Sequence, residues 1–283
     1  MAKYSIEDLY KDIFTINGYF GVKDDGSKFA NGSIKKYCKF GNTSGSGICL
    51  DYHEMATSGV INLVENLMKY GLDYDKLAEY AILFLSYKLN QSPEYRHRKL
   101  NDIYTKDIEK NKYYNEKIKD NDLTCKEIIN RKKDLMNTNE IFKFNDPFSI
   151  LCKLYTECDK KKNSYTNCSN DARDFAQKFE NLNEDSNING NISYSKLLST
   201  LSDDYNNLKN NYGNNNNSCN FPSLPKVKTP PSKLIPVLSI FPVIPVFLGI
   251  AYKYSLFRVD KLFQRQYLRK KLKKVKKKLK LNI

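Results

Sequence analysis

The feature that most constrains this chain is an uncharged stretch near its C-terminus, Leu234–Tyr252. At about 1.5 Å rise per residue, a helix of this length reaches roughly 30 Å, the thickness of the hydrocarbon core of a bilayer. Pro236, Pro242 and Pro245 would weaken a helix in water, but prolines are better tolerated in membrane spans. The sequence therefore predicts a transmembrane helix over residues 234–254, kinked at the last two prolines, with a buried core helix as the alternative.

The positive charge of the chain is concentrated directly after this stretch. Of a net charge of +15, +12 lies between Lys253 and Ile283, where thirteen Lys and Arg residues accompany one acid, Asp260. Basic residues beside a span stay on the cytoplasmic side, so we expect a cytoplasmic tail over residues 255–283 and the preceding domain outside. A juxtamembrane block favours the anionic lipids of the inner leaflet over nucleic acid as the partner. The lysines expected to contact lipid are Lys270, Lys271, Lys273, Lys274, Lys276, Lys277, Lys278 and Lys280.

The tail also has the periodicity of an amphipathic helix. Leu268, Leu272, Val275 and Leu279 follow one another at steps of 4, 3 and 4, which places them on one stripe with Lys and Arg on the other faces. Neighbouring lysines repel, so a solvated coil is expected in water. On an anionic bilayer the lipid charge offsets this repulsion, and we expect a helix there.

The region before the span, residues 1–212, is predicted to be an all-α domain. Its first residues lack the basic and apolar segments of a signal peptide, so we expect the internal span to act as the targeting signal. Apolar residues recur at helical spacing, and no strand pattern of comparable strength is present. The expected helices lie within Met1–Tyr19, Met55–Tyr70, Lys76–Leu89, Glu94–Lys119, Cys125–Met136, Phe148–Lys162, Asp171–Leu182 and Tyr194–Leu208.

A segment rich in Asn and Pro connects this domain to the span. Asn206–Asn220 has the composition of an unstructured segment. Phe221–Ser232 contains four prolines, which predict a stiff, extended spacer. We therefore interpret residues 213–233 as a stalk.

The chain has seven cysteines, which predict disulfides in a domain that lies outside. Cys152 and Cys158 stand about 9 Å apart along one predicted helix, too far to bond to each other. Reduced, buried thiols are the alternative to disulfides. The expected pairs are Cys38–Cys49, Cys158–Cys168 and, by elimination, Cys125–Cys152, with Cys219 free on the stalk.

The sequence contains no convincing catalytic or metal-binding pattern. The two histidines, His53 and His97, lack zinc-ligand spacing to any cysteine pair. His53 follows Cys49 by four residues, but nothing else supports a nucleophile pair. The loop Gly41–Gly47 lacks the Gly-Lys-Ser/Thr ending of a phosphate-binding loop. We expect no enzymatic activity, cofactor, metal or small-molecule substrate.

Several segments resemble one known family. They are Asp51–Leu63, Ala78–Asn90, Asp146–Tyr155, Pro245–Phe257 and Arg265–Arg269. Their order, together with the span and the basic tail, resembles the PIR (Plasmodium interspersed repeat; Yir/Bir/Cir) variant surface proteins. Family members often have Trp where Phe84 stands and fewer prolines in the span, so this chain departs from the pattern at both places.

The resemblance implies a multigene antigen family with a helical ectodomain, one span, a cytoplasmic tail and no catalysis. It also implies a location at parasite membranes or at the surface of the infected host cell. We therefore expect a membrane-anchored variant surface antigen that serves host adhesion and immune evasion, with an unknown host receptor or antibody as partner. The alternative is an intracellular membrane scaffold or trafficking protein that acts through its basic tail.

Overall fold

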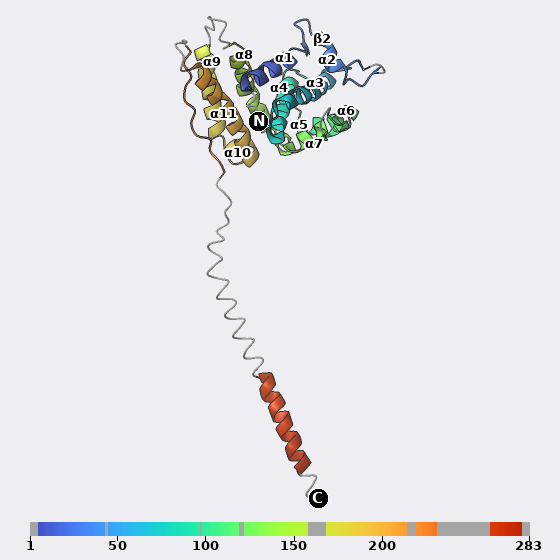
Figure 1. Cartoon of the computed structure of the whole chain (residues 1–283), viewed down its shortest axis with the longest axis vertical. Helices are drawn as coiled ribbons and strands as arrows, with labels where there is room; N and C mark the ends of the chain where they lie inside the picture. The colour runs from blue at the N-terminus through green and yellow to red at the C-terminus, as the bar shows by residue number, and fades with distance from the viewer. Residues whose placement is uncertain are drawn as a thin grey trace. The chain divides into compact units, whose positions relative to one another are not determined.

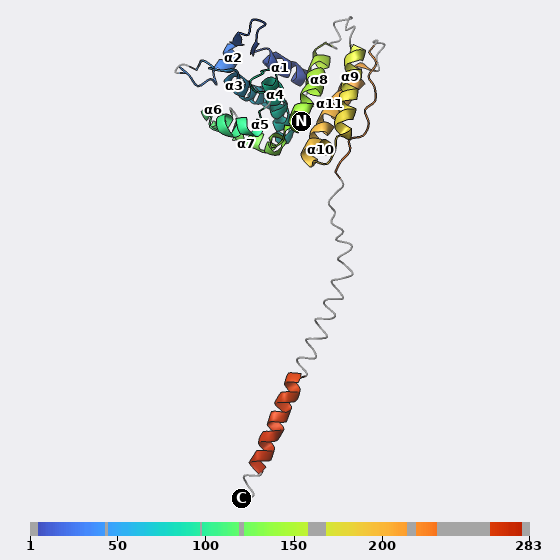
Figure 2. The same ribbon diagram turned by 180° about the vertical axis from the view of Figure 1, so that it is seen from behind.

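The computed structural model describes residues 5–42, 45–96, 98–118, 122–157, 168–213, 219–230 and 261–278 (Figures 1 and 2). The chain divides into two compact units, Met1–Pro231 and Ser232–Ile283. The longer helices of the first unit are α1 (Ile6–Asn17), α3 (Tyr52–Leu67), α4 (Tyr74–Asn90), α8 (Asn145–Glu157), α9 (Cys168–Glu184) and α11 (Ile192–Tyr212). Shorter elements are α2 (Gly32–Lys35), α5 (Leu100–Ile103), α6 (Lys112–Asn115), α7 (Cys125–Asn130) and α10 (Ser186–Asn189), the 3-10 turns η1 (Met68–Tyr70), η3 (Lys133–Met136) and η4 (Asn139–Phe144), and the π turn η2 (Tyr104–Ile108).

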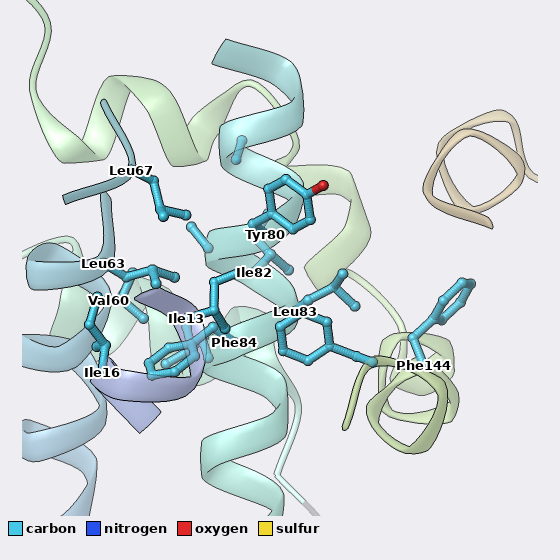
Figure 3. Close-up of a cluster of buried hydrophobic side chains, with 14 of the residues drawn as sticks. Ile13, Ile16, Val60, Leu63, Leu67, Tyr80, Ile82, Leu83, Phe84 and Phe144 are labelled. Atoms are coloured by element: carbon cyan, nitrogen blue, oxygen red, sulfur yellow. The ribbon is translucent and has the colours of Figure 1, made fainter. Parts of the chain in front are cut away.

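Helix α4 lies at the centre of the first unit. Asp73 caps its start by accepting a hydrogen bond from the backbone N of Asp75 at 2.8 Å. Nearly every side chain from Leu77 to Leu89 is buried, and a helix that is apolar on all faces belongs in a core. Helices α3, α7 and α8 pack against it. Figure 3 shows side chains of α1, α3 and η4 gathered around Ile82, Leu83 and Phe84 of α4.

The mostly helical fold class predicted from the sequence is confirmed, with one addition. Strands β1 (Phe20–Val22) and β2 (Lys28–Ala30) form an antiparallel hairpin in which Phe20 is opposite Ala30. Its turn contains Gly26, whose φ of 80° suits a residue without a Cβ. Three-residue strands are too short to produce a clear alternating pattern, so the sequence did not reveal them.

The prediction of one long helix over Glu94–Lys119 is wrong. Its described residues fold into α5, the π turn η2 and α6. The backbone N of Glu109 bonds to the carbonyl O of Tyr104 at 2.9 Å, the five-residue spacing that ends the turn. The side chain of Asn111 then accepts a hydrogen bond from the N of Tyr113 and starts α6. A polar residue that prefers helix caps therefore divides a segment that has an apolar stripe of helical period.

The predicted stalk is also different in the structure. Helix α11 extends into the Asn-rich segment as far as Tyr212. Residues 219–230, which we call the strap, are extended as expected but lie on the first unit instead of forming a free spacer. The Asn183 side chain on α9 binds the strap twice, donating to the O of Lys226 at 2.9 Å and accepting from the N of Lys228 at 2.7 Å. Phe221 is buried against the ring of Tyr205 on α11, at 5.8 Å between ring centroids.

Two of the three predicted disulfides are wrong, and so is the prediction of a free Cys219; the position of the strap explains the first of them. Cys219 is bonded to Cys168, with a Cα–Cα distance of 5.6 Å, so Cys168 is not available to Cys158, which lies outside the described residues. Cys125 and Cys152 are free thiols. They cannot pair, because Cys125 is buried beside Tyr104 and Tyr114, whereas Cys152 lies beside Tyr10 and Asp204. Cys38 and Cys49 form the predicted disulfide.

The described part of the second unit is a single helix over residues 261–278, which we call the tail helix (Figures 1 and 2). Within the described ranges, no helix has both the length and the apolar character needed to cross a membrane. The predicted span, residues 234–254, lies outside those ranges.

Candidate functional surface

The cystine loop, residues 38–49, is described over 38–42 and 45–49. These residues project from the side of the first unit that carries α2 and α3, away from α9 and the strap (Figures 1 and 2). The Cys38–Cys49 disulfide closes its base, with a Cα–Cα distance of 4.8 Å. Directly above the disulfide, the backbone N of Ile48 donates to the O of Phe40 at 2.8 Å. A Cβ at Gly47 would lie 2.3 Å from the carbonyl O of Cys38, so only glycine allows this close approach.

The carboxylate of Glu54 holds both arms of this loop. Its Oε1 accepts a hydrogen bond from the N of Lys39 and its Oε2 from the N of Leu50, each at 2.7 Å. These two residues directly follow the two bonded cysteines. Glu54 is itself fixed in the first turn of α3, where its own N donates to Oδ1 of the capping Asp51 at 2.7 Å. Charge-assisted bonds to backbone N–H groups are stronger than neutral ones, so the loop has a rigid base.

This rigid base presents three large apolar side chains to solvent, which we call the apolar patch. Phe40 is 58% exposed, Ile48 59% and Leu50 69%. Phe40 and Leu50 also line a recess of about 360 Å³, together with Lys39, Asp51, His53, Glu54 and Thr57. An exposed apolar cluster around a hollow is typical of a protein-binding surface, because leaving it in water has a free-energy cost that binding removes.

The surroundings of the apolar patch are basic. The segment from Gly32 to Leu50 contains Lys35, Lys36 and Lys39 and no acid. Asp51 and Glu54 lie at the inner side of the recess, and both already accept backbone hydrogen bonds. Glu65 on α3 pairs with Lys36 at 3.1 Å, which leaves the charges of Lys35 and Lys39 for a partner. The surface that fits this patch therefore combines apolar groups with negative charge.

The histidines do not form a catalytic or metal site in the described structure. His53 is buried and stacks on Tyr95, with ring centroids 5.7 Å apart. His97 lies outside the described residues. No group of three or more His, Cys, Asp or Glu side chains in the described part of the chain could hold a metal ion. Burial raises the pKa of the thiols of Cys125 and Cys152, which makes both poor nucleophiles at neutral pH.

The structure describes most of the lysines that were predicted to contact lipid. Seven of the predicted lipid-contact lysines, from Lys270 to Lys278, lie on the tail helix and are exposed, whereas Lys280 lies outside the described residues. The apolar patch and the role of Glu54 were not predicted from the sequence. A signal was present, since Phe40, Ile48 and Leu50 adjoin or nearly adjoin two cysteines in an otherwise polar, Gly-rich loop.

Comparison with known proteins identifies the family. The family model "Plasmodium variant antigen protein Cir/Yir/Bir" matches residues 10–253. This chain is a member of the Cir/Yir/Bir family. A solved structure described as a Plasmodium PIR protein ectodomain has 33% sequence identity to this Cir/Yir/Bir protein and a TM-score of 0.58. That alignment covers 78% of this chain and 100% of the solved chain. The comparison with curated proteins finds no match.

The region matched by the family model covers most of the first unit and the predicted span. Residues 10–253 contain the cystine loop, the strap and the predicted span of this Cir/Yir/Bir protein, but not the tail helix. The resemblance to PIR proteins noted in the sequence is therefore confirmed, and the chain is a Plasmodium variant antigen.

Proposed function

We propose that this protein is a membrane-anchored variant surface antigen whose helical ectodomain contacts a host protein through the apolar patch. The patch carries the proposal, because three exposed apolar side chains on a base fixed by a disulfide and by Glu54 are preorganised for binding. The uncharged stretch Leu234–Tyr252 and the basic residues after it support anchoring with the ectodomain outside. Immune evasion follows if antibodies and the host partner meet the same surface.

A protein partner fits this surface better than a lipid bilayer does. Asp51 and Glu54 line the recess between Phe40 and Leu50, and a bilayer would strip water from these carboxylates without supplying donors. A protein can instead place one apolar side chain in the recess and acidic groups against Lys35 and Lys39.

The topology is tested by treating intact infected cells with trypsin. The ectodomain, residues 1–230, should be lost while a cytoplasmic marker protein remains uncut. Full protection of the ectodomain would contradict the proposal. It would favour the second candidate, an intracellular membrane scaffold that acts through its basic tail, which the exposed Lys and Arg side chains of the tail helix support.

The contact surface is tested with substitutions in the full chain displayed on a cell. The double variant Phe40→Ser, Leu50→Ser should bind host blood cells at least about 10-fold more weakly, because the loss of central apolar anchors typically costs 2 kcal/mol or more. The readout is flow cytometry at equal surface expression.

Ile192→Ser is the matched control for this experiment. Ile192 is 64% exposed and stands at the start of α11, far along the chain from the cystine loop. An equal loss of binding in both variants, or no loss in the double variant, would rule out the apolar patch as the contact surface.

A further inference from the structure

The tail helix has a composition unlike the rest of the chain. Its 18 described residues include eight Lys and two Arg and no acid. Every apolar side chain on it is at least 51% exposed. Unscreened repulsion among so many like charges destabilises a helix in water, which indicates that this helix belongs against a negatively charged surface.

The second half of the tail helix has a defined apolar face. At about 100° per residue, Leu268, Leu272 and Val275 fall within an arc of roughly 60°. Lys271 and Lys276 flank this arc on its two sides, each about 40° beyond its edge, and the remaining cations of this half lie further round. Flanking lysines can extend their ammonium groups to phosphates while their methylene stems cover apolar surface.

The first half of the tail helix does not continue this face. Lys261 and Arg265 occupy the positions in line with Leu268 and Leu272, whereas Phe263 and Tyr267 lie on a different side of the helix. A long, unbroken stripe would favour a coiled-coil partner, which needs apolar residues over several heptads. A short stripe within a broad basic face is instead typical of a helix that lies in a membrane interface.

Anionic lipid is the surface that the position of the helix makes available. Eight residues separate Tyr252, the end of the uncharged stretch, from Lys261, and at about 3.6 Å per residue they reach no further than roughly 30 Å. If the stretch spans the membrane, the helix is therefore held close to the headgroups, where the effective lipid concentration exceeds that of any free polyanion. Each cation near an anionic leaflet adds to the attraction.

We propose that the tail helix lies in the headgroup layer of an anionic leaflet, with Leu268, Leu272 and Val275 toward the acyl chains and Lys277 toward water. This inference rests on the membrane anchoring proposed above. It adds that the tail is bound to lipid along a defined face and is not a free cytoplasmic segment.

The natural chain contains no tryptophan, which allows a test with a single reporter. The full-length variants Leu272→Trp and Lys277→Trp place it on the apolar face and on the opposite face. Each is reconstituted into vesicles of phosphatidylcholine alone and of phosphatidylcholine with about one third phosphatidylserine. Leu272→Trp should show a blue-shifted emission and quenching by brominated acyl chains only in the anionic vesicles. Lys277→Trp should show neither, and high salt should reverse the shift of Leu272→Trp because it screens the headgroup charge.

Other results of this experiment would contradict the lipid contact, the assigned face of the helix or the membrane anchoring. Equal emission of Leu272→Trp in neutral and anionic vesicles would overturn the lipid contact, and equal shifts for the two variants would overturn the assigned face. A blue shift that appears in neutral vesicles only after RNA is added would assign the tail to nucleic acid. Extraction of the protein from the vesicles by alkaline carbonate would instead overturn the membrane anchoring, which separates a failure of the proposed function from a failure of this inference.

Discussion

Buried polar side chains join the helices of the ectodomain at two places. At the first, the carboxylate of Asp204 on α11 accepts hydrogen bonds from the hydroxyls of Tyr10 on α1 at 2.8 Å and Tyr80 on α4 at 2.7 Å. Lys76 donates to the same carboxylate at 3.2 Å. Burial raises the pKa of Asp204, while Lys76 and the two hydroxyls oppose the shift. The network fixes the relative position of three helices, because each misplaced partner would leave a buried group unpaired.

The second place is Lys88 on α4, which is 2% exposed. Its Nζ donates to the O and Oδ1 of Asn17 at 3.1 and 2.9 Å and to the O of Phe20 at 3.0 Å. The ammonium also lies 4.2 Å from the centre of the Phe20 ring. These contacts tie the end of α1 and the start of β1 to the central helix. Burial lowers the pKa of Lys88 from 10.5 to about 7.

This lowered pKa of Lys88 predicts a pH dependence of stability. Between pH 7 and about 10 the unfolded chain keeps a proton on Lys88 that the folded chain releases, so the free energy of unfolding should rise with pH. One proton contributes at most about 1.4 kcal/mol per pH unit. Urea denaturation of the wild type and of Lys88→Met between pH 7 and about 10 gives the free energy of unfolding of each protein. The contribution of Lys88 is the difference between the two pH slopes.

Subtracting the unfolding free energy of Lys88→Met from that of the wild type removes the contribution of the buried tyrosines, which both proteins contain. The pKa of Tyr10 and Tyr114 is raised by burial, so they stabilise the fold below their unfolded pKa near 10 and lose this effect above it in both proteins. Lys196→Met, which removes an exposed lysine, should leave the wild-type pH slope unchanged. If the difference in unfolding free energy between the wild type and Lys88→Met did not change with pH, Lys88 would have to stay charged at its buried site.

The strap depends on side chains of α9 and α11 for its position. Besides Asn183, the hydroxyl of Tyr205 donates to the O of Pro222 at 3.0 Å, and Ser195 donates to the O of Lys228 at 3.2 Å. Most of these bonds go to the backbone of the strap, so its conformation is held by the helices. The prolines of this segment lower the entropy lost when it docks.

Asn183→Ala should therefore loosen the end of the strap. The substitution leaves the O of Lys226 and the N of Lys228 without their side-chain partner, at a cost of about 1–3 kcal/mol. Limited proteolysis with trypsin should then cleave after Lys226 and Lys228 several-fold faster than in the wild type. Asn181→Ala, two residues earlier on an exposed face of α9, is the control, and equal cleavage rates in the two variants would contradict the role of Asn183.

Local sequence patterns predicted the longer helices of the ectodomain but not its long-range connections. Helices α3 and α4 follow from the spacing of their apolar residues, such as Val60, Val64 and Leu67 in α3. Their packing around Phe84 depends on the same apolar faces (Figure 3). These signals act within a few residues, so a single sequence contains them completely.

The features that were missed depend on residues far apart in the chain. Cys168 and Cys219 are 51 residues apart, and only the return of the strap along α9 brings them together. Composition indicated that Phe221–Ser232 is extended, but it could not show that Asn183 binds it. The apolar patch was overlooked for a related reason, because exposed side chains have no periodicity and only the surrounding structure shows that they are uncovered.

The strap also determines how the ectodomain responds to mechanical tension. A pull on residues beyond Pro230 peels the strap from its end, so the bonds at Lys228 and Lys226 break one after another. Peeling stops at Cys219, because there the strap is covalently joined to α9, and the load passes into that helix. The cystine loop projects from the other side of the ectodomain, outside this path (Figure 1). Tension applied at the end of the strap would therefore lengthen the strap while the cystine loop kept its shape.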